Sequence, residues 1–323
     1  MSTHEHLEPS GGSKDGGGAP ARRVLVLGAT GYVGGLLVPV LLERGHAVRC
    51  LVRDPAKLAG RPWAADVEVL KGDALDLESL PAAFRGIEAI YYLIHSMGAG
   101  AGADFARRDR QAASNVALVA REQGVGRILY LAGLGAEEGE LSEHLASRRE
   151  VERVLAGSAV PLTVFRAAVI VGAGSVSFQM VRYLAERLPV LITPRWVSTR
   201  IQPVAQDDVL RYLADALSSP DSLGRTFEIG GSDVLTYGDM IRVYSRMRGL
   251  RRALIPVPVL TPKLSSYWVG LVTPISSSIA IPLIQGMKSE VVVTDPAARE
   301  VFPFEPLSYE EAVRRVLAES PRP

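Results

Sequence analysis

Three glycines at regular spacing are the first residues whose pattern indicates a ligand. Gly28, Gly31 and Gly34 lie in the segment GATGYVG, between a short apolar run and a stretch of helical periodicity. Glycines in such a turn let the backbone approach a pyrophosphate, and the following helix presents free N–H groups to the phosphates. Because this turn follows a strand pattern and opens a helix pattern, we predict a nucleotide-binding turn. A turn that is only structural is the alternative.

The end of the second predicted strand indicates which nucleotide binds. Units that bind NAD place an Asp or Glu about 20 residues after the glycine turn, where it contacts the ribose. Here Arg53 occupies that place, 19 residues after Gly34, and a guanidinium can pair with a 2′-phosphate. We therefore favour NADP(H) over NAD(H). Asp54 follows directly and keeps NAD(H) open, and a solvated Arg53 without a ligand is the third alternative.

These residues need an alternating series of strands and helices to position them. Such alternation is typical of an α/β fold with a doubly wound parallel sheet. We expect a core at 21–172 and a smaller C-terminal substrate-side region at 173–323, which returns to the core near 200–231. Short apolar runs predict strands at 24–27, 47–52, 67–70, 88–93, 127–132, 162–166 and 226–229. Helical periodicity predicts helices from Val33 to a C-cap at Gly45, and at 76–84, 104–123, 142–155 and 177–188.

Composition excludes several classes of protein. The 323 residues carry 36 Lys and Arg against 35 Asp and Glu, which leaves no basic excess for a dedicated nucleic-acid binder. The single cysteine, Cys50, excludes an intramolecular disulfide and a site built from several cysteines, and we predict no metal site. Residues 1–20 are rich in glycine and hold no apolar run. We therefore expect a disordered tail rather than a signal peptide, and a cytoplasmic protein.

Four segments together resemble a known family. GATGYVGG, LVRDPAKL, GDALD and YYLIHSM are similar to the NAD(P)H-binding, NmrA-like and epimerase-like branch of the atypical short-chain dehydrogenase/reductase superfamily, over about residues 22–235. The resemblance implies a Rossmann-type core with the cofactor across the carboxyl ends of the strands. It implies phosphate contacts at Gly28, Thr30, Gly31, Tyr32 and Val33, a 2′-phosphate contact at Arg53, adenine contacts at Asp73 and Ala74, and nicotinamide-ribose contacts from Leu93 to Ser96, which include Ile94 and His95.

One departure from that family concerns the chemistry itself. Its catalytically standard members carry a Ser or Thr after the fifth strand and Tyr-x-x-x-Lys on the next helix. Here the fifth strand ends at Gly133 without a hydroxyl, and the Tyr and Lys positions fall on His144 and Arg148. His144 could act as a general acid or base near neutral pH, and Arg148 could contact substrate or ribose. Both side chains lying solvated on an outer face is the alternative.

Three further features carry open alternatives. His95 follows the fourth strand, so it lies either beside the cofactor or in a structural role. Asp207 and Asp208 could form a pair of catalytic carboxylates, but capping a helix and complementing its dipole is the simpler interpretation. Residues 264–287 contain no charged residue, and 24 residues are long enough to span a bilayer. Because two prolines interrupt them, we favour a pocket wall or subunit interface over a transmembrane span or attachment to a membrane surface.

These features together predict an NADP(H)-dependent oxidoreductase that transfers hydride to or from an apolar, isoprenoid- or quinone-like small molecule. It lacks the usual Tyr–Lys pair, so the cofactor would carry the chemistry and the protein would orient it. The alternative is a non-enzymatic redox sensor or assembly factor that binds NADP(H) and a protein partner. A pocket sealed beside the nicotinamide favours the enzyme, and a crevice filled by side chains favours the sensor.

Overall fold

The computed structural model describes residues 20–94, 103–135, 142–257, 286–287 and 289–319. The predicted tail up to residue 19, His95, and residues 264–285 of the uncharged segment lie outside the described residues. Among the helices of the described ranges, none combines the length and apolarity that crossing a membrane requires.

A seven-stranded sheet forms the centre of the larger part of the molecule. Its strands are β1 (Arg23–Leu27), β2 (Ala47–Val52), β3 (Glu68–Lys71), β4 (Ala89–Tyr92), β5 (Arg127–Gly133), β6 (Leu162–Ala167) and β11 (Thr226–Ile229). They lie in the order β11-β6-β5-β4-β1-β2-β3, and every neighbouring pair is parallel. The predicted doubly wound parallel sheet is confirmed, and each predicted strand ends within one residue of the observed one.

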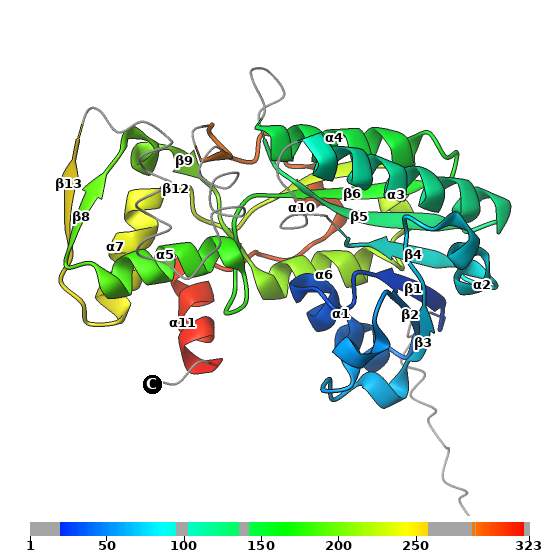
Figure 1. The fold of residues 1–323 in the computed structure, drawn as a ribbon. Helices are drawn as coiled ribbons and strands as arrows, with labels where there is room; N and C mark the ends of the chain where they lie inside the picture. Colours follow the sequence, from blue (N-terminus) through cyan, green and yellow to red (C-terminus); the bar gives the residue numbers. More distant parts are fainter. Residues whose placement is uncertain (1–19, 95–102, 136–141, 258–285, 288, 320–323) are drawn as a thin grey trace, which may run out of the picture.

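Burial on both faces explains why these strands read as apolar runs. In β1, Val24 and Val26 point to one face and Leu25 and Leu27 to the other, and all four are at most 2% exposed. Figure 1 shows the two helical layers that cover the sheet. The first is α1 (Tyr32–Glu43), α6 (Gln206–Ala216) and α10 (Ala297–Val301), and the second is α2 (Leu80–Phe84), α3 (Ala103–Glu122) and α4 (Glu143–Ala156).

The helix ends follow the expected signals. Helix α1 contains Pro39, and Gly45 follows its C-cap residue with φ of +81°, the left-handed conformation that ends many helices. Helix α7 (Tyr237–Met247) begins with a capping box, in which Thr236 and Asp239 each accept a hydrogen bond from the other's N–H. The Ser308 hydroxyl accepts a hydrogen bond from the third residue of α11 (Tyr309–Glu319).

The C-terminal half builds a second, smaller part beside the sheet (Figure 1). Helix α5 (Val176–Arg187) packs with α7 and α11 around a separate apolar core that includes Phe178, Tyr244 and Tyr309. Between α5 and α7 the chain returns to the central sheet as α6 and β11, so it crosses between the two parts. Three two-stranded sheets complete the smaller part: β7 (Ile170–Val171) with β10 (Val204–Ala205), β9 (Arg200–Ile201) with β12 (Leu235–Thr236), and β8 (Val190–Thr193) with β13 (Ala253–Pro256).

The pair of carboxylates at Asp207 and Asp208 has a structural role. Both lie in the first turn of α6, where they complement the helix dipole as expected, but the N-cap residue is Ala205 and its side chain makes no cap. The predicted side-chain cap is therefore wrong. The Asp208 carboxylate accepts a hydrogen bond from the Leu307 N–H at 2.8 Å, and Asp207 pairs with Arg315 at 2.8 Å. These two contacts hold α11 and the segment before it against α6.

Candidate functional site

The glycine turn joins β1 to α1 through close backbone contacts. Gly28 has φ of +100°, and a Cβ there would lie 2.7 Å from the carbonyl oxygen of Leu93, just after β4. A Cβ at Gly34 would lie 2.3 Å from the carbonyl oxygen of Gly28. Packing therefore requires glycine at both positions. Gly31 differs, because a Cβ there would meet only the Gly28 carbonyl oxygen, at 3.1 Å, among the described residues.

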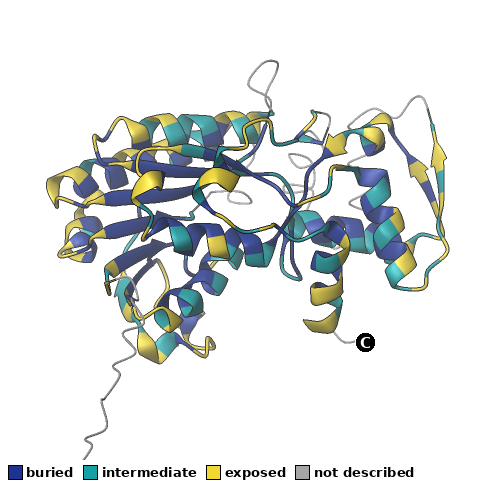
Figure 2. Cartoon of the chain, turned by 180° about the vertical axis from the view of Figure 1, so that it is seen from behind, coloured by how far each residue is buried: buried dark blue, intermediate teal, exposed yellow. Residues whose placement is uncertain are grey.

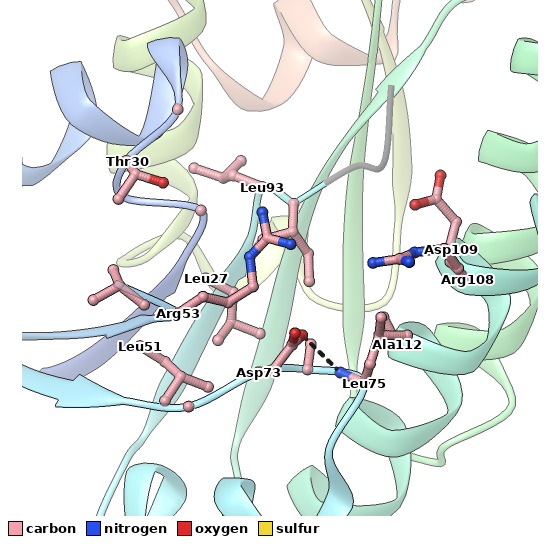
Figure 3. A pocket seen from close by; sticks show the side chains of 16 residues that line it. Leu27, Thr30, Leu51, Arg53, Asp73, Leu75, Leu93, Arg108, Asp109 and Ala112 are labelled. Atoms are coloured by element: carbon pink, nitrogen blue, oxygen red, sulfur yellow. Dashed lines mark hydrogen bonds between the residues drawn. The ribbon is translucent and has the colours of Figure 1, made fainter. Parts of the chain in front are cut away.

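A cavity of about 440 Å³ opens beside this turn, at the carboxyl ends of β1 to β4. Because β1 has β2 on one side and β4 on the other, the cavity lies where the strand order reverses. Ligands of open α/β sheets bind at this point, and the volume falls within the range of small-molecule sites. Figure 3 shows the side chains that line it, which come from the strand ends, the turn and α3.

Eight of the twelve predicted cofactor residues are brought together in this lining. Two groups of predicted residues lie elsewhere: Tyr32, Val33 and Gly34 belong to the first turn of α1 and are outside the lining, and His95 lies outside the described residues. The residues predicted to contact the pyrophosphate, the 2′-phosphate and the adenine thus line the same cavity. The eight residues are Gly28, Thr30, Gly31, Arg53, Asp73, Ala74, Leu93 and Ile94.

Two arginines approach the cavity from opposite walls (Figure 3). Arg53 follows β2, Arg108 comes from α3, and both guanidinium groups point into the space between them. The Nε of Arg108 is buried and has no hydrogen-bond partner among the described residues. Asp73 lies on the same lining and accepts a hydrogen bond from the Leu75 N–H at 3.0 Å. Two cations that face one space suit an anion such as a phosphate group.

The wall that α3 contributes to the cavity, which carries Arg108 and Asp109, was not predicted from the sequence. The helix was predicted, but Arg107, Arg108 and Arg110 look alike in the sequence. Only their position around the helix separates them, since Arg108 faces the cavity while Arg107 and Arg110 are exposed. The sequence could have indicated that one face of α3 lines the ligand site. It could not have indicated which arginine lies on that face.

A buried ion pair links α3, α4 and the end of β4 beside the cavity. Arg148 and Asp109 are 5% and 4% exposed, and Nη2 of Arg148 lies 3.7 Å from Oδ2 of Asp109. The Ser147 hydroxyl donates to the same oxygen at 3.3 Å, and Nη1 of Arg148 donates to the carbonyl oxygen of Ile94 at 3.4 Å. Arg148 is therefore not on a solvated outer face. It holds the backbone immediately before His95.

His144 lies in the first turn of α4, one helical turn before Arg148. Its side chain is half-buried, its Nδ1 is buried, and it is not among the residues that line the cavity. At the end of β5, a Cβ at Gly133 would lie 2.7 Å from Cδ2 of Leu145, the end of a side chain that can move aside. Helix α4 thus packs directly on the glycine. Proton transfer by His144 stays a prediction.

Tyr32 connects the glycine turn to the smaller part of the molecule. A Cβ at Gly174 would lie 2.6 Å from the Tyr32 ring, and the Tyr32 hydroxyl donates a hydrogen bond to Oε1 of Gln206 at the start of α6. Burial raises the pKa of Tyr32 to about 12, so the hydroxyl keeps its proton at neutral pH. These contacts direct the Tyr32 side chain toward Gly172 and Gly174 and away from the cavity. Only the backbone of Tyr32 could make the predicted phosphate contact.

Comparison with known proteins agrees with this geometry. Residues 28–185 match the model of the family described as NAD(P)H-binding. The photosystem II assembly factor Ycf39 of Trieres chinensis is 25% identical over 252 residues, which are 76% of this chain and 76% of that protein. Citrobacter sp. triphenylmethane reductase, solved with NADP(H), has a TM-score of 0.71 at 22% identity, over 91% of this chain and 100% of that one. The NADPH-dependent quinone oxidoreductase of Escherichia coli, solved with NADPH, has a TM-score of 0.71 at 20% identity, over 91% and 99%. The chain thus carries an NAD(P)H-binding domain, and the two structures share its fold.

Two glycine substitutions should separate the fold from the ligand. Gly31→Val places a side chain at the cavity wall, so we expect NADPH binding to weaken by more than about tenfold, or ~1.4 kcal/mol, with a native circular dichroism spectrum. Gly34→Ala overpacks against backbone and should lower the free energy of unfolding by about 1–3 kcal/mol. Urea denaturation and fluorescence titration of NADPH measure the two effects.

Gly60→Ala is the matched control, because no atom of the described residues lies within 4 Å of the Cβ position at Gly60. It should leave both stability and binding close to those of the wild type. Normal NADPH binding by Gly31→Val would mean that the turn is only structural.

Proposed function

We propose that the chain belongs to the NmrA-like and epimerase-like branch of the atypical short-chain dehydrogenase/reductase superfamily, and that it is an NADP(H)-dependent oxidoreductase acting on an apolar small molecule. One observation carries the proposal: the cavity at the strand-order reversal combines a glycine turn, a helix N-terminus and two inward-facing arginines. This set of donors fits a dinucleotide that carries an additional phosphate.

The choice of NADP(H) over NAD(H) rests on what Arg53 and Asp54 do. Arg53 points into the cavity, whereas the Asp54 carboxylate accepts a hydrogen bond from the Ala56 N–H and caps the short helix Pro55–Leu58. Asp54 is not in the cavity lining, so its carboxylate is not positioned for the ribose hydroxyls as an NAD-specific acid would be. Arg108 adds a second cation on the opposite wall. Both observations support a 2′-phosphate in this space.

Each part of the site has a distinct task in the proposed reaction. The backbone at Gly31 and the N-terminus of α1 bind the pyrophosphate, and Arg53 binds the 2′-phosphate. Asp109 holds Arg148, which in turn fixes the Ile94 carbonyl and so positions the end of β4. When bound, the nicotinamide supplies or accepts the hydride. His144 is the proposed proton donor or acceptor, since the family's Tyr is absent at its position.

The apolar substrate is supported by the surroundings of the cavity and by the neighbours. Leu27, Leu93 and Ile94 give its wall near β1 and β4 an apolar character that suits a hydrophobic acceptor. The two neighbouring structures bear the names of a triphenylmethane reductase and a quinone oxidoreductase. A quinone is therefore the first substrate class to test, with the hydride passing to the quinone and a proton completing the hydroquinone.

A second candidate function is a redox sensor or assembly factor that binds NADP(H) without turnover. The similarity to a photosystem II assembly factor favours it, as does the absence of a Ser or Thr hydroxyl at the end of β5, where Gly133 stands. The two candidates differ in one observable. Both bind NADPH, but only the enzyme oxidises it in the presence of an acceptor.

Cofactor choice is tested by the two arginines that face the cavity. Arg53→Ala should weaken NADPH binding about tenfold to 100-fold, because a hydrogen bond to a charged group contributes about 1.5–3 kcal/mol, and should leave NADH binding nearly unchanged. Arg108→Ala should act in the same direction. Arg121→Ala, an exposed arginine on the same helix, is the control. Fluorescence titration of both cofactors measures the effects, and equal losses for NADPH and NADH would contradict the assignment.

Turnover is tested by following NADPH absorbance with 1,4-naphthoquinone as acceptor. The wild type should oxidise NADPH, and His144→Ala should lose about 10²–10⁴-fold in rate while keeping its cofactor affinity. A loss of less than tenfold would show that His144 is not the acid. Tight NADPH binding without any oxidation by quinone or ketone acceptors would favour the sensor.

A further inference from the structure

The two-stranded sheet of β8 and β13 exposes an apolar face at the far end of the smaller part (Figure 2). Val190, Ile192 and Ile255 are 47%, 45% and 49% exposed, and they are among the most exposed large apolar side chains of the described residues. The parallel register pairs Ala253 with Val190 and Ile255 with Ile192. These four side chains, here called the apolar face, therefore lie on one side of the sheet.

On the other side of the same sheet, Leu191 and Thr193 of β8 are buried and Leu254 of β13 is half-buried, whereas Pro256 at the end of β13 is exposed. Leu191, between the two exposed residues of β8, is 2% exposed and packs into the core that α5, α7 and α11 share. Parallel strands are normally covered on both faces, and exposed edge strands normally carry charges that discourage association. The apolar face has neither a cover among the described residues nor a charged side chain of its own.

Two exposed arginines flank the apolar face at its two ends. Five other arginines of segments 182–200 and 240–257 form ion pairs with Glu186, Asp239, Glu290 or Glu310, so their charges are matched by carboxylates. Arg251 immediately precedes β13, and Arg195 follows β8 at the opposite end of the sheet. Both are exposed, and neither has an acidic partner within 4 Å among the described residues. Arg252 donates to the carbonyl oxygens of Ala185 and Glu186, so its charge is not neutralised by a carboxylate.

We propose that the apolar face and its flanking arginines form a docking surface for an anionic lipid bilayer. The four apolar side chains would enter the boundary between headgroups and acyl chains, and Arg195 and Arg251 would contact lipid phosphates at either end of the sheet. Apolar burial combined with cationic flanks is the pattern by which proteins bind membrane surfaces without spanning them. The arginines decide between possible occupants, because a second copy of the chain would bring the same positive charge to the interface.

The docking surface goes beyond the proposed oxidoreductase activity and does not depend on it. The cavity lies at the ends of β1 to β4, in the other part of the molecule, so lipid binding and NADPH binding can fail separately. If both are present, docking would bring the protein to the phase in which an apolar substrate dissolves.

Flotation of the full chain, saturated with NADPH, tests the proposal. The vesicles are phosphatidylcholine alone, or phosphatidylcholine with phosphatidylglycerol, at about 0.15 M salt. The wild type should float with the mixed vesicles and bind those of phosphatidylcholine alone at least tenfold more weakly. Ile192→Asp with Ile255→Asp should remove binding. Arg195→Gln with Arg251→Gln should weaken it about 25-fold, since each arginine near an anionic surface contributes about fivefold.

Two matched controls change the same chemistry elsewhere. Leu77→Asp with Leu223→Asp alters two exposed leucines outside the apolar face, and Arg85→Gln with Arg121→Gln removes two exposed arginines from the other part of the molecule. Both should float like the wild type. All variants should keep their NADPH affinity and thermal midpoint. Ile192→Ser with Ile255→Ser is a milder variant for use if Ile192→Asp with Ile255→Asp does not fold.

Three results would overturn the proposal. The wild type could fail to float with either vesicle, the apolar-face and arginine variants could float as well as their controls, or light scattering could show a wild-type dimer that Ile192→Asp with Ile255→Asp dissociates. The last result would assign the apolar face to a second copy of this chain.

Discussion

The close approach of two backbone segments, the β1–α1 turn and the end of β4, determines the rest of this site. A side chain at Gly28 would clash with the carbonyl oxygen of Leu93, and a side chain at Gly34 would clash with the carbonyl oxygen of Gly28. Only glycine lets α1 begin this close to the sheet, and only then does its N-terminus face the cavity at the strand-order reversal. The position of the glycine turn is thus fixed by van der Waals contact with the neighbouring strand, before any ligand is considered.

Two sets of contacts connect the glycine turn and the end of β4 to the surrounding helices. On one side, the Tyr32 ring packs on Gly174 and its hydroxyl reaches Gln206, which ties the turn to the start of α6. On the other side, the buried pair of Asp109 and Arg148 holds α3 and α4 to the carbonyl of Ile94. Removing one partner of a buried ion pair leaves an uncompensated buried charge. Replacing either Asp109 or Arg148 alone should therefore destabilise the protein. The cavity is therefore bounded by rigid elements on both sides.

The sequence predicted the sheet well because its strands are buried on both faces, and a continuous apolar run with turn residues at its ends leaves little ambiguity. The strands Ala47–Val52 and Thr226–Ile229 were predicted to the residue. The cavity lining was predicted at Arg53 because that residue directly follows a strand, and at Asp73 because of the resemblance to the family. It was missed on α3, because a helix presents its charged residues in every direction and the sequence does not say which one turns inward. The direction of Tyr32 and the burial of Arg148 depend on tertiary packing, which no local pattern encodes.

The central claim is that this cavity holds NADP(H) between the glycine turn and Arg53. A crystal structure of the protein with NADP⁺ tests it most directly. We predict that the pyrophosphate lies against the backbone of Gly31 at the N-terminus of α1, and that the 2′-phosphate lies within hydrogen-bond distance, about 3 Å, of the Arg53 guanidinium. A cofactor bound away from the turn, or a 2′-phosphate in solvent with Arg53 turned away from it, would contradict the account.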